Sequence, residues 1–239
     1  MKNNKQNLSD QLGMAITSSS AAIKRTAIFE LQIRLMNIIG IAPLNAIMNK
    51  KAQTTATLNL RGIRLLAISG SLRSGSSNHH ILKYLGTQVP TDINYIIYDE
   101  LALIPPFDPG LDNDTPPDAV VRLRGLLTNA DGLIICTPEY AFGVPGQLKN
   151  MLDWLVSSSS LVEKPVALIT ASLGGEHAHA SLLLTLGALN SHVVDGATLV
   201  ISFIRSKMDA NGQVIHQETE KSLNILIHNF LTLITNSSQ

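Results

Sequence analysis

The side chains best suited to bind an anion lie in one short segment, residues 70–78, with the sequence GSLRSGSSN. It offers serine hydroxyls, one guanidinium group (Arg73) and one side-chain amide (Asn78). An apolar run precedes it and a helical pattern follows it, so it connects a buried strand to the start of a helix. Backbone N–H groups at a helix N-terminus point outward, and the helix dipole favours negative charge there. The segment therefore predicts a phosphate-binding loop, although a Gly/Ser turn that only caps the helix has the same composition.

A second segment, residues 137–154, reads TPEYAFGVPGQLKNMLDW. Pro145 suits the first turn of a helix, and the leucines that follow at helical spacing should face a sheet. The loop before this helix exposes backbone polar groups between Tyr140 and Phe142, which suits contact with a flat ring that has polar edges. An ordinary strand–helix loop has a similar composition and stays open as an alternative.

A third segment, residues 171–177, reads ASLGGEH. It follows another apolar run. Its two adjacent glycines would let the backbone approach a ligand closely.

The elements that position these segments alternate between short apolar runs and helical patterns. Nearly continuous apolar runs are typical of parallel strands covered on both faces, and repeated alternation with helices predicts a doubly wound α/β sheet. The expected strands are 63–69, 93–98, 132–137, 165–171 and 197–204, and the expected helices are 78–89, 117–130, 146–157, 176–190 and 214–234.

The three segments follow the first, third and fourth expected strands. In the strand order 2-1-3-4-5 these strands are neighbours, and open α/β sheets bind ligands beyond the carboxyl ends of their strands at the switch point of that order. A phosphate site, a surface for a ring and a glycine pair would then meet at one sheet edge.

The first two segments carry a recognisable pattern: Gly-Ser-Leu-Arg-x-x-Ser-x-Asn at 70–78, and Pro-Glu-Tyr-x-x-x-x-Pro-Gly-x-Leu-Lys-Asn-x-x-Asp-Trp at 138–154. Over residues 61–205 the chain resembles the NADPH-dependent FMN reductases, which include chromate/quinone reductases and azoreductases. The resemblance implies a flavodoxin-like, three-layer α/β/α fold with a five-stranded parallel sheet. It also implies transfer of a hydride from NADPH or NADH to FMN, and then of electrons to a quinone, azo compound, metal oxyanion or free flavin.

The resemblance assigns roles to the three segments. The FMN phosphate would be held by the first, the ring would lie along the second, and the third would close its other side. The implied residues are Ser71, Arg73, Ser76 and Asn78; Pro138, Glu139, Tyr140 and Ala141; and Ser172, Gly174 and Gly175.

Two departures from the family pattern bear on the site. Many members have Asn where this chain has Ala141, so backbone contacts must suffice there. Many have Arg shortly after the glycine pair, where this chain has Glu176 and His177, which leaves the binding of NADPH open. The scheme needs no protein nucleophile, and we assign no catalytic acid or base.

Composition excludes several classes of protein. The formal net charge is zero and gives no case for nucleic acid as a partner. The single cysteine, Cys136, lies in an apolar run, so we expect a core residue and no disulfide framework. No metal site is expected, because no carboxylate cluster completes the histidine pairs at 79–80 and 177/179. No apolar stretch is long enough to span a membrane.

Residues 1–60 differ from the rest of the chain. They carry seven Lys/Arg and two acidic residues, against eleven and sixteen in residues 61–239. We interpret 1–60 as an extension, either a targeting segment, an arm, or a leader upstream of a true start near Met48, and 61–239 as the FMN-binding domain. By resemblance we expect a cytoplasmic homodimer or homotetramer that acts on small molecules.

Two other functions stay open at this stage. One is an electron carrier of the flavodoxin type, although such carriers are usually more acidic than this domain. The other is a binding module that keeps the fold without flavin. The colour of the purified protein and its bleaching by NAD(P)H would separate the three.

Overall fold

The computed structural model describes residues 62–237. The expected N-terminal extension, residues 1–60, lies outside the described residues. Among those described, no helix combines the length and the apolar character needed to cross a lipid bilayer.

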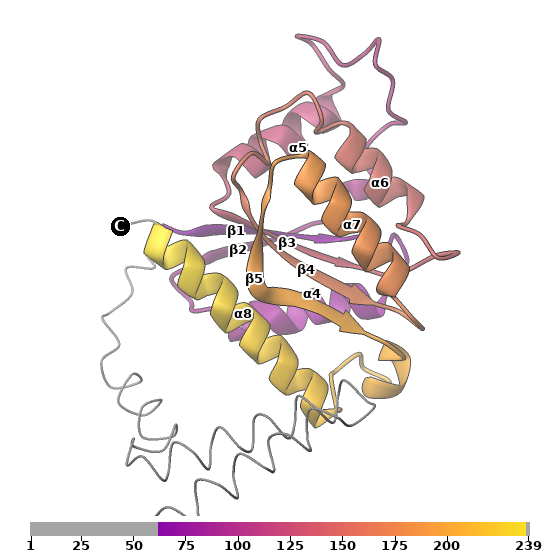
Figure 1. Cartoon of the computed structure of the whole chain (residues 1–239), viewed down its shortest axis with the longest axis vertical. Helices are drawn as coiled ribbons and strands as arrows, with labels where there is room; N and C mark the ends of the chain where they lie inside the picture. Colours follow the sequence, from indigo (N-terminus) through magenta and orange to yellow (C-terminus); the bar gives the residue numbers. More distant parts are fainter. Residues whose placement is uncertain (1–61, 238–239) are drawn as a thin grey trace, which may run out of the picture. The chain divides into compact units, whose positions relative to one another are not determined.

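Five strands form one parallel sheet in the order β2-β1-β3-β4-β5, which confirms the expected topology (Figure 1). The strands are β1 (Arg64–Ser69), β2 (Asn94–Tyr98), β3 (Gly132–Thr137), β4 (Pro165–Ala171) and β5 (His192–Ile201). The helices are α4 (Ser77–Gln88), α5 (Asp118–Asn129), α6 (Gly146–Asp153), α7 (Glu176–Ala188) and α8 (Gln217–Ser237), with short 3₁₀ helices η1 (Leu101–Leu103) and η2 (Ile204–Lys207).

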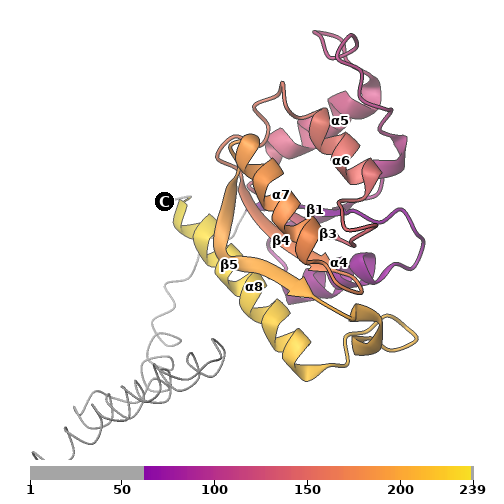
Figure 2. The ribbon, with the colours of Figure 1, turned by 45° about the vertical axis from the view of Figure 1, so that its right-hand side comes forward.

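The sheet separates two apolar cores because alternate side chains of its central strands point to opposite faces. Leu65 and Ala67 of β1 pack in the core under α4 and α8, whereas Leu66 and Ile68 pack in the core under α5, α6 and α7. Both faces are therefore covered by helices, as the two ribbon views show (Figures 1 and 2). This explains why the central strands read as continuous apolar runs in the sequence.

The expected position of the last strand, 197–204, was wrong. β5 begins at His192 and ends at Ile201. It is an edge strand with only partial burial, and its register with β4 shifts between Val166 and Leu168. Gly196, with φ of +72°, lies in the same irregular stretch. An edge strand interrupted in this way lacks the continuous apolar run that identifies a buried strand.

Helix α6 fixes the proline-rich loop that follows β2. The Asn150 side chain accepts from the Phe107 N–H at 2.7 Å and donates to the Pro105 carbonyl at 2.8 Å. The indole N–H of Trp154 donates to the same carbonyl at 2.8 Å, and Trp154 is fully buried. These two residues of the second sequence motif therefore hold structure together. The helix ends at Asp153, where 146–157 was expected.

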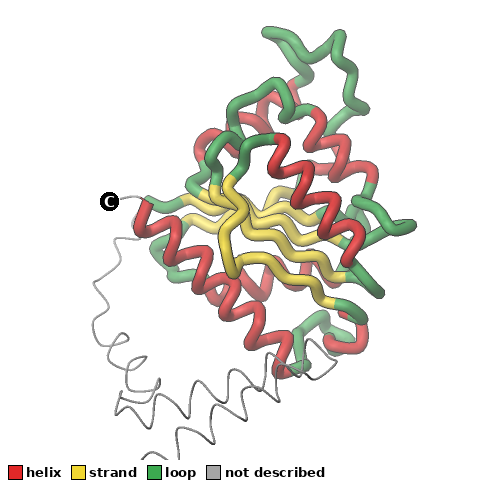
Figure 3. The backbone as a smooth tube through the Cα atoms, in the orientation of Figure 1, coloured by secondary structure: helices red, strands yellow, loops and turns green. Residues whose placement is uncertain are grey.

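The loops after β1, β3, β4 and β5 all leave the carboxyl edge of the sheet (Figure 3). Because the strands are parallel, segments separated by more than a hundred residues meet at this edge.

Candidate functional site

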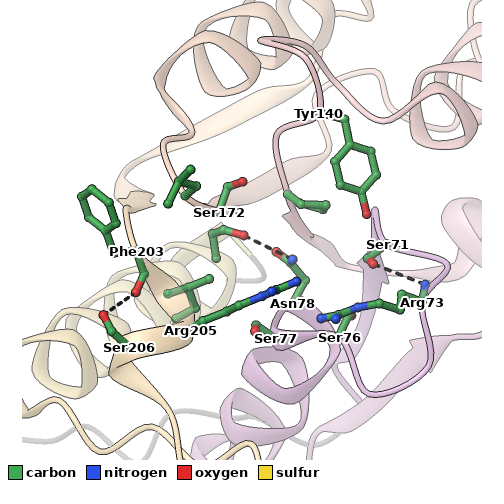
Figure 4. A pocket seen from close by; sticks show the side chains of 14 residues that line it. Ser71, Arg73, Ser76, Ser77, Asn78, Tyr140, Ser172, Phe203, Arg205 and Ser206 are labelled. Carbon is green, nitrogen blue, oxygen red and sulfur yellow. Dashed lines mark hydrogen bonds between the residues drawn. The ribbon is translucent and has the colours of Figure 1, made fainter.

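A pocket of about 480 Å³ lies at the carboxyl edge of the sheet (Figure 4). Its size falls within the range of about 300–1,000 Å³ typical of small-molecule and cofactor sites. Four segments line it, one after each of β1, β3, β4 and β5. The lining residues are Ser71, Arg73, Ser76, Ser77, Asn78, Pro138, Tyr140, Ala171, Ser172, Leu173, Phe203, Ile204, Arg205 and Ser206.

The loop after β1 presents hydrogen-bond donors to the pocket. Ser76 is the N-cap of α4, and its hydroxyl oxygen accepts from the His79 N–H at 3.2 Å. Ser71 Oγ accepts from the Arg73 N–H at 3.3 Å, so the protons of both hydroxyls are left to donate. The N–H groups of Ser77 and Asn78 have no hydrogen-bond partner within residues 62–237. This end of the pocket is a donor-rich site of the kind that binds anions.

Gly70 allows the start of the loop after β1 to pack closely against the end of β3. Its N–H donates to the Cys136 carbonyl at 2.9 Å. A Cβ atom at this position would lie 2.2 Å from Thr137 Oγ1 and 2.9 Å from a methyl group of Leu148. Any side chain would therefore push the loop away from β3 and displace the donors that follow it.

The Asn78 side chain is engaged by the protein. It is 4% exposed, donates to the Ala171 carbonyl at 3.3 Å, and accepts from the Cys136 thiol at 3.3 Å. Burial raises the pKa of that thiol well above its ordinary value, so it stays protonated as the donor. Asn78 thus ties the start of α4 to β3 and β4, and the group it leaves for a ligand is its backbone N–H.

The loop after β3 makes a tight hairpin turn beside the pocket. Tyr140 and Gly143 exchange two backbone hydrogen bonds, of 3.0 and 2.9 Å, around Ala141 and Phe142. Those two residues have φ of 47° and 59°, as a type I′ turn requires. The turn points Ala141 and Phe142 outward, and Pro138 and Tyr140 are the members of this loop that line the pocket.

Glu139 lies between two of the pocket loops but does not line the pocket. Its carboxylate accepts from the Ala178 N–H in the first turn of α7 at 2.9 Å. The N-cap of α7 is Gly175, which has no side chain to fill that role. The Ser172 hydroxyl also donates to the Glu139 carbonyl at 3.3 Å. Glu139 therefore couples the loop after β3 to the loop after β4.

The glycine pair shapes the loop after β4 without lining the pocket. Gly175 has φ of +132°, a conformation that favours glycine. A Cβ atom on Gly174 would lie within 3.4 Å of carboxylate oxygens from both Glu139 and Glu176. The pair thus permits close packing of the loop onto α7, while Ser172 and Leu173 reach the pocket.

The corner after β5 also lines the pocket, and the sequence interpretation missed it. Phe203 and Ile204 donate backbone hydrogen bonds to the carbonyls of Leu173 and Ser172, at 3.1 Å each. Arg205 and Ser206 follow on η2 and line the pocket with them. The misplaced end of the last strand hid this corner. The rule that parallel strands end at one edge could have found it.

Within the described residues, 62–237, the charged side chains that line the pocket are Arg73 and Arg205, and no acidic side chain lines it. Neither guanidinium has an ion-pair or hydrogen-bond partner in the part of the chain that the structure describes. No His, Lys or Cys side chain among residues 62–237 lines the pocket. Among residues 62–237, no group of three or more potential ligands is placed to hold a metal ion.

The sequence-predicted residues thus divide into two groups. Those that line one pocket are Ser71, Arg73, Ser76, Asn78, Pro138, Tyr140 and Ser172. Those that adjoin the pocket without lining it are Glu139, Ala141, Gly174 and Gly175.

Known proteins match this chain over the domain just described. The family model for NADPH-dependent FMN reductase matches residues 63–205, more than half of the chain. A quinone reductase of Escherichia coli is 32% identical over 164 residues, which cover 66% of this chain and 87% of the relative. An NAD(P)H-dependent FMN reductase of Pseudomonas aeruginosa is also 32% identical over 164 residues, which cover 66% of this chain and 88% of that relative.

A solved structure matches the fold as well. The flavoenzyme NAD(P)H:(acceptor) oxidoreductase FerB of Paracoccus denitrificans aligns with a TM-score of 0.59 and 26% identity, over 72% of this chain and 97% of that chain. The chain therefore belongs to the NADPH-dependent FMN reductase family, flavodoxin-like oxidoreductases that use FMN as cofactor and NAD(P)H as electron donor.

Proposed function

We propose that the pocket holds FMN with its phosphate at the start of α4 and its ring between the loops after β3 and β4. The observation that carries this proposal lies at one end of the pocket (Figure 4), where backbone N–H groups and guanidinium groups that have no partner within residues 62–237 come together. The pocket is also lined by Tyr140, Leu173 and Phe203, whose large apolar side chains suit contact with the flavin ring system.

At the phosphate end, the N–H groups of Ser77 and Asn78 donate to the anion, and the hydroxyl protons of Ser71 and Ser76 add to them. Arg73 supplies a positive charge and a planar pair of donors that matches phosphate geometry. The positive end of the α4 dipole supports the same charge, since the first turn of α4 contains no acidic residue.

At the ring end, Pro138 and Tyr140 form one wall, and Ser172 with Leu173 forms the other. Glu139, Gly174 and Gly175 act on the cofactor indirectly, because they set the shape of these two loops. Ala141 contributes through its backbone, since its side chain lies on the exposed tip of the turn.

When bound, FMN supplies hydride acceptance from a nicotinamide and electron transfer to a second substrate. The protein's part is to hold the cofactor, orient its ring toward the open side of the pocket, and shield its phosphate. We propose that the acceptor is a quinone or another flat aromatic compound, because Tyr140 and Phe203 are 55% and 62% exposed beside the pocket. Azo compounds, free flavin and metal oxyanions are the acceptors to compare with it.

We also propose that the protein acts in the cytoplasm, because the NAD(P)H pool lies inside the cell. We further propose that it assembles into a homodimer or homotetramer. Exposed apolar side chains near the pocket, Leu72, Phe142, Leu173 and Phe203, support assembly. Light scattering on the purified full chain tests the oligomeric state, and a monomer at all concentrations would contradict it.

The proposed function is tested by two half-reactions observed separately. The purified chain is saturated with FMN and mixed anaerobically with NADPH or NADH, and bleaching of the visible flavin absorption is followed. A quinone, an azo dye, chromate or free flavin is then added, and the return of absorption is timed.

We expect bleaching by at least one nicotinamide and fastest reoxidation by the quinone. A chain that binds FMN but is not bleached by either nicotinamide would be an electron carrier and would contradict the proposal. A chain that binds no FMN would refute the cofactor site. Faster reoxidation by chromate than by the quinone would overturn the proposed acceptor class.

A further inference from the structure

We propose that Arg205 is a second guanidinium ligand of the FMN phosphate, facing Arg73 across the pocket. This inference rests on the proposed function and adds a binding residue from a segment, 202–206, that lies at the end of the region matched by the family.

The backbone that carries Arg205 is fixed in place. Phe203 has φ of 54° at the corner after β5, and its N–H donates to the Leu173 carbonyl at 3.1 Å. The next residue, Ile204, is buried and donates to the Ser172 carbonyl at 3.1 Å. These two backbone hydrogen bonds tie the corner that carries Arg205 to the loop after β4, so the backbone position of Arg205 is fixed.

The side chain of Arg205 extends across the pocket toward the start of α4. Figure 4 shows it reaching from the β5 side toward the region of Ser76 to Asn78, while Arg73 reaches toward the same region from the other side. In Figure 4 both side chains end beside the labelled residues Ser76, Ser77 and Asn78 at the start of α4, where two N–H groups have no partner among the described residues.

Arg205 has no acidic partner among residues 62–237, which distinguishes it from two other arginines of the domain. Arg122 is paired with Glu100 at 3.0 Å and Arg124 with Asp112 at 2.7 Å. Arg205 and Arg73 instead line one pocket, to which the described part of the chain contributes no carboxylate. Two guanidinium groups that converge without a counter-charge repel each other, and a phosphate dianion between them removes that cost.

The chemistry points to the phosphate end of the cofactor. A guanidinium group donates two parallel hydrogen bonds to a phosphate, and such charge-assisted bonds are roughly twice as strong as neutral ones. Because Arg205 is exposed, part of its contribution is screened by salt. Its removal should therefore weaken binding of FMN, leave binding of riboflavin unchanged, and flatten the dependence of FMN affinity on ionic strength.

The test is flavin titration of the apo-protein, using full-length chain, by quenching of flavin fluorescence. Arg205→Gln is compared with the parent chain for FMN and for riboflavin, which has the same ring and no phosphate. Lys207→Gln is the matched control, because Lys207 lies on the same 3₁₀ helix, carries the same charge and does not line the pocket. Circular dichroism melting of each variant reports whether the fold is kept.

We expect Arg205→Gln to weaken FMN binding by about 10- to 100-fold, from the usual strength of a charged hydrogen bond. Riboflavin affinity should stay unchanged, and Lys207→Gln should bind both flavins like the parent. Equal loss of FMN and riboflavin affinity, or unchanged FMN affinity with a raised KM for NADPH, would overturn the inference. Failure of the parent chain itself to bind FMN would instead refute the proposed function.

Discussion

Glu139 provides the sharpest test of how the pocket is held together. We predict that Glu139→Ala destabilises the fold and weakens flavin binding, although the side chain does not line the pocket. Its carboxylate accepts the Ala178 N–H at 2.9 Å and so caps α7, whose own N-cap residue is a glycine. Removing it leaves a helix N–H without its protein partner and frees the loop that carries Pro138 and Tyr140.

The magnitude follows from two effects. Loss of a side-chain N-cap costs about 1 kcal/mol, and loss of a negative charge at a helix N-terminus costs about 0.3–1 kcal/mol. The sum is about 1–2 kcal/mol, which lowers Tm by about 2–8 °C for a domain of this size. If the freed loop must be ordered again when flavin binds, affinity falls by up to about five-fold.

The assay combines thermal melting with flavin titration. Glu176→Ala is the control, because Glu176 carries its charge in the first turn of α7 and, among residues 62–237, its side chain has one hydrogen bond, which it accepts from the Ser202 hydroxyl at 3.4 Å. The control should lose the charge contribution alone. Glu139→Gln keeps an acceptor oxygen and should fall between the parent and Glu139→Ala. Because Glu139 acts at the ring end, FMN and riboflavin should be weakened equally.

Two results would contradict a coupling role for Glu139. If Glu139→Ala melts and binds flavin like the parent, the hydrogen bond to α7 holds nothing in place. If Glu176→Ala costs as much as Glu139→Ala, the effect is general helix electrostatics and Glu139 has no special coupling role.

Three further outcomes are expected. Arg73→Ala should weaken FMN binding by about 10- to 100-fold with a change in stability below about 0.5 kcal/mol, because the exposed guanidinium has no partner within residues 62–237; unchanged flavin retention would count against the phosphate site. Gly70→Ala should cost about 1–3 kcal/mol in chemical denaturation, since its Cβ would overlap Thr137, whereas Gly125→Ala, with open space around it, should not destabilise. Burial lowers the pKa of His179 below its ordinary 6.5, so the unfolded chain binds more protons than the folded chain near that pH. Tm should therefore fall as pH drops from about 7 through 6.5 toward the folded pKa. His179→Gln should reduce this dependence of Tm on pH, and an unchanged dependence would contradict the prediction.

The sheet could be predicted from the sequence because its central strands are buried on both faces. Ala67 and Ile68 of β1 face opposite cores, so the strand reads as an unbroken apolar run. The same rule failed at β5, where one edge is open and Gly196 interrupts the register. The apolar residues Phe203 and Ile204 then extended the apparent strand past its end, and Arg205 was missed as a result.

The roles of individual site residues were harder to predict, because they depend on contacts that are distant in the sequence. Asn78 was expected to hold the phosphate with its side chain, but that amide bonds Ala171, 93 residues away. Glu139 was expected along the ring, but its carboxylate bonds Ala178, 39 residues away. Residue type and loop position identify the edge where the site lies, whereas the tertiary fold decides which atoms stay free for a ligand.

The central claim is tested most directly by a crystal structure of the chain with FMN. We expect the phosphate within hydrogen-bonding distance of the Ser77 and Asn78 N–H groups, and the ring against Pro138 and Tyr140. Flavin bound elsewhere on the domain, or bound in this pocket with its ring at the start of α4 and its phosphate between the loops after β3 and β4, would contradict it.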